Sequence, residues 1–339
     1  MNLENRIAVL VALGQRLVAA NEQHGAVYEL AYIKNKWFTV ENIENATNSL
    51  ATQMLTREKL ENWVAHYHIS EPVEVKTVAI VMAGNIPLVG FHDFLSIFVS
   101  GHLAQIKLSE KDEVLFPHIL KLMVDINPEV ELYIKTTDRL ANFDAVIATG
   151  SNNTARYFEQ YFGKYPNIIR KNRQSIGILN GNETKEEIMA LGQDIFAYFG
   201  LGCRNISKIY LPKGYDIVKI MEPLHEYNDL VNHDKYKNNF DYNIALFMLN
   251  RLNFYNNGCL ILLEDERLVS RISSVNFEYY EDINAVIEKI NNQKEDIQCI
   301  VSQEVINGLG TVRFGETQKP TLFDYPDGID VMQFLLSIS

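Results

Sequence analysis

Short apolar runs alternate with longer segments of helical spacing along most of this chain. The first apolar run is Val75–Met82, and a helical stretch from Leu88 to Val99 follows it. The further strands expected from such runs are His102–Leu108, Glu131–Ile134, Asp144–Ala148, Ser175–Gly181, Ser207–Leu211, Cys259–Leu263, Val275–Tyr280 and Asp296–Ser302. Strands that alternate with helices in this way form β-α-β units around a largely parallel sheet. The sequence therefore predicts an α/β fold with a Rossmann-like nucleotide-binding half.

The two ends of the chain depart from this alternation. Residues 1–70 are expected to be helical, because leucine and isoleucine recur there at steps of three and four residues. Trp37 and Trp63 lie near the ends of the second helical region, Val40–Tyr67, and are expected to be packing anchors. The last stretch, Gly310–Ser339, is predicted to be irregular.

The composition excludes several classes of function. Of the 339 residues 47% are hydrophobic and 22% are charged, which is typical of a soluble globular protein with two domains. The net charge of −12 argues against nucleic acid as a partner, because such binding rests on phosphate neutralisation. No apolar stretch is long enough to span a bilayer, and the first residues do not resemble a signal peptide. We therefore expect a cytoplasmic protein.

The segment Gly200-Leu201-Gly202-Cys203 places a thiol between a helical run that ends at Phe199 and the strand that begins at Ser207. Glycine allows the backbone to turn sharply or to approach a ligand. A thiol on such a turn is either reactive or a small apolar residue at a helix end. The three cysteines (Cys203, Cys259, Cys299) are odd in number and widely spaced, which fits free thiols better than disulfides or a zinc site.

Three loops are expected at the carboxyl ends of strands, namely residues 83–87, 109–112 and 149–154. Ligands of parallel sheets bind at this edge, against helix N-termini. Each loop carries small or hydrogen-bonding residues, although ordinary connections with Ser151 or Thr154 as helix caps are the alternative. The glycine-rich dinucleotide motif, the P-loop and the serine-hydrolase motif are all absent from the sequence.

Basic residues and histidines leave further alternatives open. The segment 166–174 is basic in an acidic protein, and it is either a solvated turn or a source of positive charge for phosphates. His66 and His68 have no carboxylate or cysteine partner nearby, so we expect no metal site. His225 and His233 flank a loop rich in Asn and Asp, and they are either proton donors or ordinary surface residues.

The order and spacing of these motifs resemble the aldehyde dehydrogenase superfamily, in particular its bioluminescence-type (LuxC-type) acyl-CoA reductases. Ala83–Pro87 is similar to the Asn-x-Pro loop of the superfamily, and Lys107–Glu110 to its Lys-Pro-Ser-Glu turn. Thr149–Ser151 resembles its Thr-Gly-Ser helix start, and Gly202-Cys203 matches the position of its nucleophile. The resemblance covers roughly residues 75–302. It implies an aldehyde-dehydrogenase-like fold with a Rossmann-like cofactor domain, an α/β catalytic domain and a helical N-terminal region.

The same resemblance implies a role for each matched residue. Cys203 is expected to be the nucleophile, and the side-chain amide of Asn85 joins the backbone N–H of Cys203 in holding an oxyanion. The implied cofactor-binding residues are Lys107, Ser109, Glu110, Gly150 and Ser151. NADPH is the cofactor of this reductase branch, but a carboxylate at Glu110 suits the free 2′-hydroxyl of NADH. The choice between the two therefore stays open.

The implied reaction is the reduction of a long-chain fatty acyl-CoA to the aldehyde through a thioester on Cys203. Oxidising members of the superfamily carry a glutamate before the nucleophile that activates water, whereas Ile168–Arg173 contains no carboxylate. This difference favours reduction. The superfamily's Glu-x-Phe-Gly-Pro cofactor motif is also replaced, near Ser270–Ser274. The alternatives are a CoA-acylating or acid-forming oxidoreductase of the superfamily, and a non-catalytic acyl-binding subunit beside an acyl-activating synthetase.

Three segments are expected from the resemblance and the motif positions. Residues 1–172 form the helical N-terminal region with the cofactor-binding domain, and residues 173–310 form the catalytic domain that carries Cys203. Residues 311–339 form a tail that packs back on the body. Whether the protein forms a homo-oligomer is left open.

Overall fold

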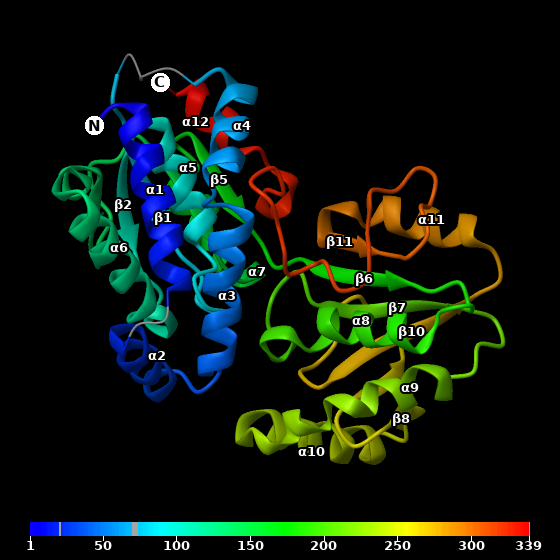
Figure 1. The fold of residues 1–339 in the computed structure, drawn as a ribbon. Coiled ribbons are helices and arrows are strands. Elements are labelled where there is room, and N and C mark those ends of the chain that lie inside the picture. Colours follow the sequence, from blue (N-terminus) through cyan, green and yellow to red (C-terminus); the bar gives the residue numbers. More distant parts are fainter. Residues whose placement is uncertain (20–21, 70–73, 339) are drawn as a thin grey trace. The chain divides into compact units, whose positions relative to one another are not determined.

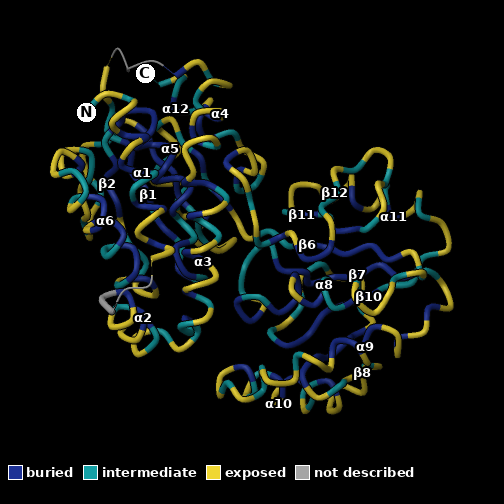
Figure 2. The backbone as a smooth tube through the Cα atoms, in the orientation of Figure 1, coloured by how far each residue is buried: buried dark blue, intermediate teal, exposed yellow. Residues whose placement is uncertain are grey.

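The chain forms two compact units in the computed structural model, which describes residues 1–19, 22–69 and 74–338 (Figure 1). The first unit comprises Met1–Asn172 together with Pro320–Ser339, and the second comprises Arg173–Lys319. Each unit is built on one largely parallel sheet with its own buried core, so the predicted α/β fold class is confirmed (Figure 2). No helix in the described part of the chain is long and apolar enough to cross a membrane.

The first unit contains a five-stranded parallel sheet in the order β3-β2-β1-β4-β5. Its strands are β1 (Thr77–Val81), β2 (Leu103–Lys107), β3 (Ile134–Thr136), β4 (Ala145–Thr149) and β5 (Asn167–Arg170). The chain runs outward from β1 to β3 and then returns to the other side of β1 as β4. The strand order therefore reverses between β1 and β4, which is the point where doubly wound sheets bind ligands.

The helices of the first unit cover this sheet and form the N-terminal region. They are α1 (Leu3–Val18), α2 (Glu22–Lys34), α3 (Val40–Gln53), α4 (Arg57–Tyr67), α5 (Phe91–Ser100), α6 (Leu115–Ile126), α7 (Asn152–Phe162) and α12 (Val331–Ser337), with the short 3₁₀ helices Glu110–Asp112, Pro128–Tyr133 and Pro326–Gly328. Asn2, Thr39 and Thr56 cap the starts of α1, α3 and α4 with their side-chain oxygens. The first unit is thus helical where the sequence predicts it to be.

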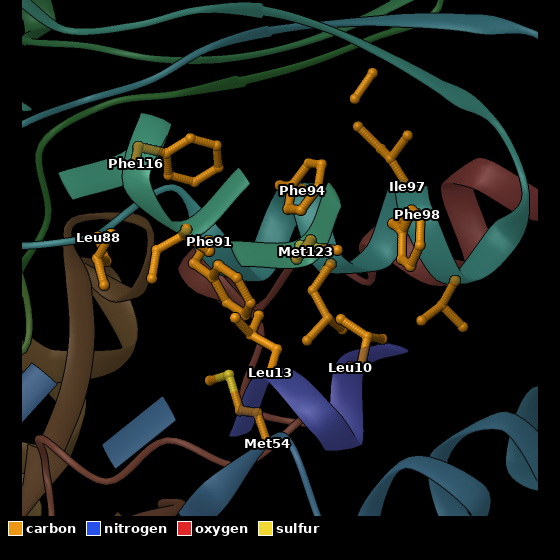
Figure 3. Close-up of a cluster of buried hydrophobic side chains, with 14 of the residues drawn as sticks. Leu10, Leu13, Met54, Leu88, Phe91, Phe94, Ile97, Phe98, Phe116 and Met123 are labelled. Carbon is orange, nitrogen blue, oxygen red and sulfur yellow. The ribbon is translucent and has the colours of Figure 1, made fainter. Parts of the chain in front are cut away.

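Helix α5 is the centre of the first core. All of its residues are buried, and Phe94 and Phe98 point toward Met123 of α6 and Leu10 of α1 (Figure 3). Gly101 follows α5 with φ 84°, a left-handed conformation that ends the helix. Because α5 is buried on every side, it lies inside the unit, with helices on one side and the sheet on the other.

The last residues of the chain complete the first unit. Val331, Met332 and Leu335 of α12 lie in the same core as α1 and α5. Trp63 is fully buried, as expected of a packing anchor, and its indole N–H donates to the hydroxyl of Tyr325 (2.8 Å). The prediction of an irregular C-terminal stretch is wrong here, because an apolar face and the Asp330 cap form α12.

The second unit contains a seven-stranded sheet in the order β12-β11-β6-β7-β10-β9-β8, parallel except for the pair β8–β9. Its strands are β6 (Gln174–Ile178), β7 (Ile206–Pro212), β8 (Phe254–Asn256), β9 (Ile261–Glu264), β10 (Ser274–Tyr280), β11 (Ile297–Val301) and β12 (Thr311–Val312). Its helices are α8 (Lys185–Phe196), α9 (Val218–Leu224), α10 (Asp234–Leu249) and α11 (Ile283–Asn292), with the 3₁₀ helices Ala197–Gly200, His225–Asn232 and Lys294–Asp296. Thr184 and Glu187 start α8 with a capping box.

The second unit runs on to Lys319, so the start of the expected tail belongs to it. Asp194 of α8 explains this extension. Its buried carboxylate accepts the N–H groups of Gly315 (2.7 Å) and Thr317 (3.1 Å) and the Thr317 hydroxyl (2.8 Å). These bonds attach the segment to α8 across more than a hundred residues of sequence.

One predicted strand is wrong. Residues 128–133 form a 3₁₀ helix instead of the strand expected at Glu131–Ile134, and β3 begins only at Ile134. Asn127 caps this helix by accepting the Glu129 N–H (3.0 Å), and Pro128 supplies a fixed φ at its first position. Val130 is the buried residue of this turn, whereas Leu132, which belongs to the apolar run that predicted the strand, is exposed.

We expect His102 to stabilise the first unit in its neutral form. Its Nδ1 accepts the Lys76 N–H (3.2 Å), so its Nε2 carries the proton donated to the Leu335 carbonyl (3.2 Å). Burial lowers the pKa of His102. His102→Phe should lower the free energy of unfolding by about 1–2 kcal/mol at pH 7, because a buried N–H and a buried carbonyl lose their partners.

The sign of the pH dependence follows from the lowered pKa of His102. The stabilisation is present above the unfolded pKa of about 6.5 and is lost as the pH falls through the folded value. Urea unfolding at pH 7 and pH 5 measures this, and the difference between wild type and variant should shrink at pH 5. A difference that grows on acidification would contradict the assignment.

Candidate active site

Cys203 lies on a strained turn in the second unit. Helix α8 ends at Phe196, earlier than predicted, because Tyr198, Phe199 and Gly200 all have left-handed φ angles of 51°, 59° and 73°. Only glycine adopts this conformation without cost, and a side chain there costs roughly 1–2 kcal/mol. The turn brings Cys203 to a half-buried position just before β7.

The other two thiols differ from Cys203 in burial. Cys259 is fully buried, and burial raises the pKa of its thiol to about 12. Cys299 is buried in β11, and Nη1 of Arg204 donates to its sulfur (3.4 Å). None of the three cysteines is joined to another in a disulfide. Cys203 is thus the thiol of this chain that is best placed to react with a substrate.

Polar side chains hold the turn around Cys203. The Ser175 hydroxyl of β6 donates to the Cys203 carbonyl (2.9 Å), and Oδ1 of Asn205 accepts the Gly202 N–H (2.8 Å). Both side chains are buried. Neither residue belongs to a sequence motif, so no local pattern points to its role.

Asn85 lies in the first unit, in the loop that follows β1. The loop turns at Leu88, whose φ is 57° and whose N–H donates to Oδ2 of Asp112 (3.1 Å). The carboxylate of Asp112 is buried and its Oδ1 has no hydrogen-bond partner. Burial raises the pKa of Asp112 to about 6. Asp112 therefore holds the loop that carries Asn85.

The loop after β2 carries the next group of predicted residues. Lys107 at the end of β2 and Glu110 are exposed, and Ser109 caps the short helix Glu110–Asp112 by accepting the Lys111 N–H (3.3 Å). A Cβ on Gly84 would lie 2.5 Å from the Ser109 oxygen, so only glycine allows this approach. The Asn85 loop and the Ser109 loop are thus in direct contact at the carboxyl edge of the sheet.

Gly150 and Ser151 lie at the same edge, after β4. Ser151 caps α7 by accepting the Thr154 N–H (3.2 Å), which was the structural alternative for this residue. A Cβ on Gly150 would lie 2.9 Å from the Phe158 ring. Because β1 is paired with both β2 and β4, the three predicted loops gather beside the point where the strand order reverses.

This donor set suits a nicotinamide dinucleotide. An exposed ammonium and an exposed carboxylate at Lys107 and Glu110 match the hydroxyls of a ribose, and the N-terminus of α7 offers N–H groups to a pyrophosphate. The His, Cys, Asp and Glu side chains of the described residues form no cluster that could hold a metal ion. Asn85 and these residues belong to the first unit, whereas Cys203 belongs to the second.

At Arg170 the basic segment is neither a solvated turn nor a source of positive charge for phosphates. Arg170 lies in β5, is buried, and forms an ion pair with Asp93 of α5 (2.5 Å). Lys171 is exposed and pairs with Glu159 (3.0 Å). The carboxylate of Asp93 within an apolar helix was the signal for a buried cationic partner. Arg170 therefore holds α5 against the sheet.

The histidines have structural contacts. His233 caps α10 by accepting the Tyr236 N–H (3.3 Å), and its ring packs on Phe199 with centroids 4.4 Å apart. His225 is exposed, and its Nδ1 lies 2.6 Å from the Asn257 carbonyl. His66 packs against the rings of Tyr67 and Phe323. Through its contacts with Tyr236 and Phe199, His233 supports the turn that carries Cys203.

Comparison of sequences identifies no relative: no family model matches the chain, and no curated protein matches it. Comparison of structures does identify a fold. The chain is similar to aldehyde dehydrogenase 21 from Physcomitrella patens, solved with the reaction product succinate, at a TM-score of 0.70 and 13% identity over 100% of this chain and 84% of that one.

Two bacterial structures are similar in the same way. An aldehyde dehydrogenase from Bacillus cereus in complex with NAD+ gives a TM-score of 0.62 at 15% identity, covering 89% of this chain and 72% of that one. A mutant of aldehyde dehydrogenase C from Pseudomonas syringae, in complex with NAD+ and octanal, gives a TM-score of 0.65 at 11% identity over 90% and 73%. The chain therefore has the aldehyde dehydrogenase fold, as the sequence resemblance implied.

Proposed function

We propose that this protein is an acyl-CoA reductase of the LuxC type, which reduces a long-chain fatty acyl-CoA to the aldehyde with NADPH or NADH. The observation that carries the proposal is the turn that holds a half-buried thiol, Cys203, in a chain with the aldehyde dehydrogenase fold. The absence of a carboxylate from Ile168–Arg173 favours reduction over acid formation. In this region Arg170 is buried in an ion pair, so it does not activate water.

The first step is the transfer of the acyl group to Cys203. The sulfur of Cys203 attacks the carbonyl carbon, the carbon–sulfur bond to CoA breaks, and the thiol proton of Cys203 leaves to solvent or to the departing thiolate. The products are an acyl thioester on Cys203 and free CoA. Asn85 and the backbone N–H of Cys203 stabilise the oxyanion of the tetrahedral species, at about 3–4 kcal/mol per donor.

The second step releases the aldehyde from Cys203. A reduced nicotinamide, when bound, supplies the hydride that converts the thioester carbon into a thiohemiacetal. A proton from solvent completes this thiohemiacetal, and its collapse breaks the carbon–sulfur bond and leaves the electron pair and that proton on the sulfur of Cys203. Lys107 and Glu110 would hold the ribose, Gly150 and Ser151 would lie beside the pyrophosphate, and Ser109 supports their loop. We place NADPH first because of the resemblance, while the Glu110 carboxylate favours NADH.

We also propose a cellular location and partners for this enzyme. Three free thiols fit a reducing compartment, so we place the protein in the cytoplasm. The partners proposed are the fatty acyl-CoA substrate, an acyl-activating synthetase that supplies it, and a second copy of the chain in a homo-oligomer. CoA-acylating or acid-forming activity is the second candidate for the same site.

Labelled long-chain acyl-CoA tests the proposal. We expect the protein to retain label on Cys203 without reductant and to release labelled aldehyde with NADPH or NADH, as measured by mass spectrometry and chromatography. Release as free fatty acid supports the acid-forming alternative. Label that never enters Cys203 would overturn both enzyme hypotheses and leave an acyl-binding subunit.

A further inference from the structure

The peptide groups on both sides of Cys203 are held by two residues outside the matched motifs. Asn205 binds the peptide groups of Gly202, and Ser175 binds the carbonyl of Cys203. We propose that Asn205 and Ser175 are positioning residues that orient the backbone N–H of Cys203 for acyl transfer. The inference deepens the proposed function and rests on it.

Asn205 contacts three parts of the turn. Its Oδ1 accepts the Gly202 N–H (2.8 Å), and its Nδ2 donates to the carbonyls of Asp194 (3.0 Å) and Ala197 (2.9 Å) at the end of α8. The side chain is 3% exposed, so these bonds form without competition from water. Only an amide offers a donor and an acceptor in one short planar group. Asn205 therefore ties the end of α8 to the residue before the nucleophile.

The backbone of Asn205 adds the contact that matters for orientation. Its N–H donates to the Gly202 carbonyl (3.1 Å). That carbonyl belongs to the same planar peptide group as the Cys203 N–H. Fixing the carbonyl of Gly202 therefore fixes the direction of the N–H that would bind the oxyanion. This backbone bond can still form in Asn205→Ala, but the side-chain bonds to Gly202 and to the end of α8 hold Asn205 in the position from which its N–H directs that carbonyl.

Ser175 holds the other side of Cys203. Its hydroxyl lies 3.1 Å from the Cys299 backbone nitrogen and 2.9 Å from the Cys203 carbonyl oxygen. Because the Cys299 N–H can only donate, the hydroxyl oxygen accepts there, and its single proton goes to Cys203. Ser175 is fully buried in β6, so it attaches the cysteine turn to two neighbouring strands.

The strain of the turn supports a functional role for these contacts. Tyr198 and Phe199 are held at left-handed φ angles, which persist only where surrounding contacts impose them. The Asn205 bonds to Asp194 and Ala197 lie directly before these residues, and the bond to Gly202 lies directly after them. The side chain of Asn205 thus forms hydrogen bonds on both sides of the strained segment, Tyr198–Leu201.

Comparing the rates of acyl transfer and of alkylation at Cys203 tests whether Asn205 positions the oxyanion donor or only keeps the turn folded. In Asn205→Ala we expect the rate of CoA release at saturating acyl-CoA to fall by roughly 10- to 100-fold, with KM changed by less than about 3-fold, because the oxyanion donor is misdirected. Alkylation of Cys203 by iodoacetamide needs no oxyanion donor and should change by less than about 3-fold. Ser175→Ala should show the same pattern, and Ser175→Thr should recover most of the rate.

Asn257→Ala is the matched control. Asn257 also accepts two backbone N–H groups, of Cys259 (3.1 Å) and Leu260 (2.8 Å), and donates to the Met221 carbonyl (2.9 Å). It lies in the same unit but contacts no residue of the cysteine turn in these bonds. We expect wild-type rates of CoA release in Asn257→Ala despite a comparable loss of stability.

The outcomes distinguish the two levels of the proposal. Equal falls in the rates of CoA release and alkylation would mean that Asn205 only keeps the turn folded. Wild-type rates in Asn205→Ala would mean that Asn205 has no positioning role. Either result overturns the inference. If the wild-type protein accepts no acyl group, the proposed function fails, and the inference fails with it. Acylation of the wild type with slow acylation of both Asn205→Ala and Ser175→Ala supports both.

Discussion

Cys203→Ser should abolish acyl transfer from acyl-CoA, lowering the rate of CoA release by roughly 10³-fold or more. Serine retains the size and polarity of the side chain but is a far weaker nucleophile at neutral pH than a thiol. The bonds that hold the turn involve the Cys203 carbonyl and the neighbouring Gly202, so they survive the substitution. A burst assay that counts free CoA thiol measures the effect directly.

Cys259→Ser provides the control for this experiment. Cys259 is buried, its thiol pKa is raised to about 12, and its contacts are the Leu224 carbonyl and Asn257. We expect the Cys259→Ser variant to release CoA at the wild-type rate. Acyl label that remains after Cys203→Ser and maps to another cysteine would refute the assignment of the nucleophile.

Asp112→Asn should change how the stability of the protein depends on pH. Burial raises the pKa of Asp112 from an ordinary value of 3.8 to about 6, so the folded state binds this proton more tightly than the unfolded state does. The free energy of unfolding therefore falls as the pH rises from about 4 to 6, by about 2–3 kcal/mol for this one group. Asparagine carries no charge, so this fall should be absent in the variant.

The variant should also retain the contact that shapes the Asn85 loop. The amide oxygen of asparagine can accept the Leu88 N–H as Oδ2 of Asp112 does now. Asp112→Ala also lacks the charge but loses that acceptor, so it should unfold more easily than Asp112→Asn by about 1–2 kcal/mol at every pH. Urea unfolding between pH 4 and pH 7 distinguishes these effects.

Asp144→Asn is the control for the charge change. Asp144 is exposed in the same unit, and its Oδ2 accepts the Thr77 N–H (2.7 Å). A fall in stability between pH 4 and 6 that persists in Asp112→Asn would show that Asp112 is not the group responsible.

Local pattern was sufficient to predict most of the fold. The alternation of apolar runs and helical segments predicted β1, β2 and β4 of the first sheet and β6, β7, β9, β10 and β11 of the second to within a few residues, whereas the short strands β8 and β12 were not predicted. Glycine and capping residues also mark where single helices end and begin, as Gly101 does at the end of α5 and Ser151 at the start of α7. The strand expected at Glu131–Ile134 failed because so short an apolar run fits a 3₁₀ turn equally well.

The predicted residues of the candidate site were found through motifs, and the residues that support them were not. Asn85, Ser109 and Ser151 each follow a strand, so their common edge follows from parallel pairing. Ser175 and Asn205 support Cys203 through bonds to backbone groups, and such bonds leave no pattern in the sequence. The prediction for Arg170 was wrong because its ion-pair partner, Asp93, is 77 residues away in the sequence.

The sequence alone determined the α/β class, the loops at the carboxyl edge of the first sheet, and the thiol that follows α8. These features depend on periodicity and on neighbours within a few residues. Tertiary structure alone decided that Cys259 and Cys299 are buried while Cys203 is not, and that α12 returns to complete the first unit. It also decided that Ser175 and Asn205 hold the thiol's turn. Burial and long-range hydrogen bonds depend on which distant segments pack together, and no local pattern carries that information.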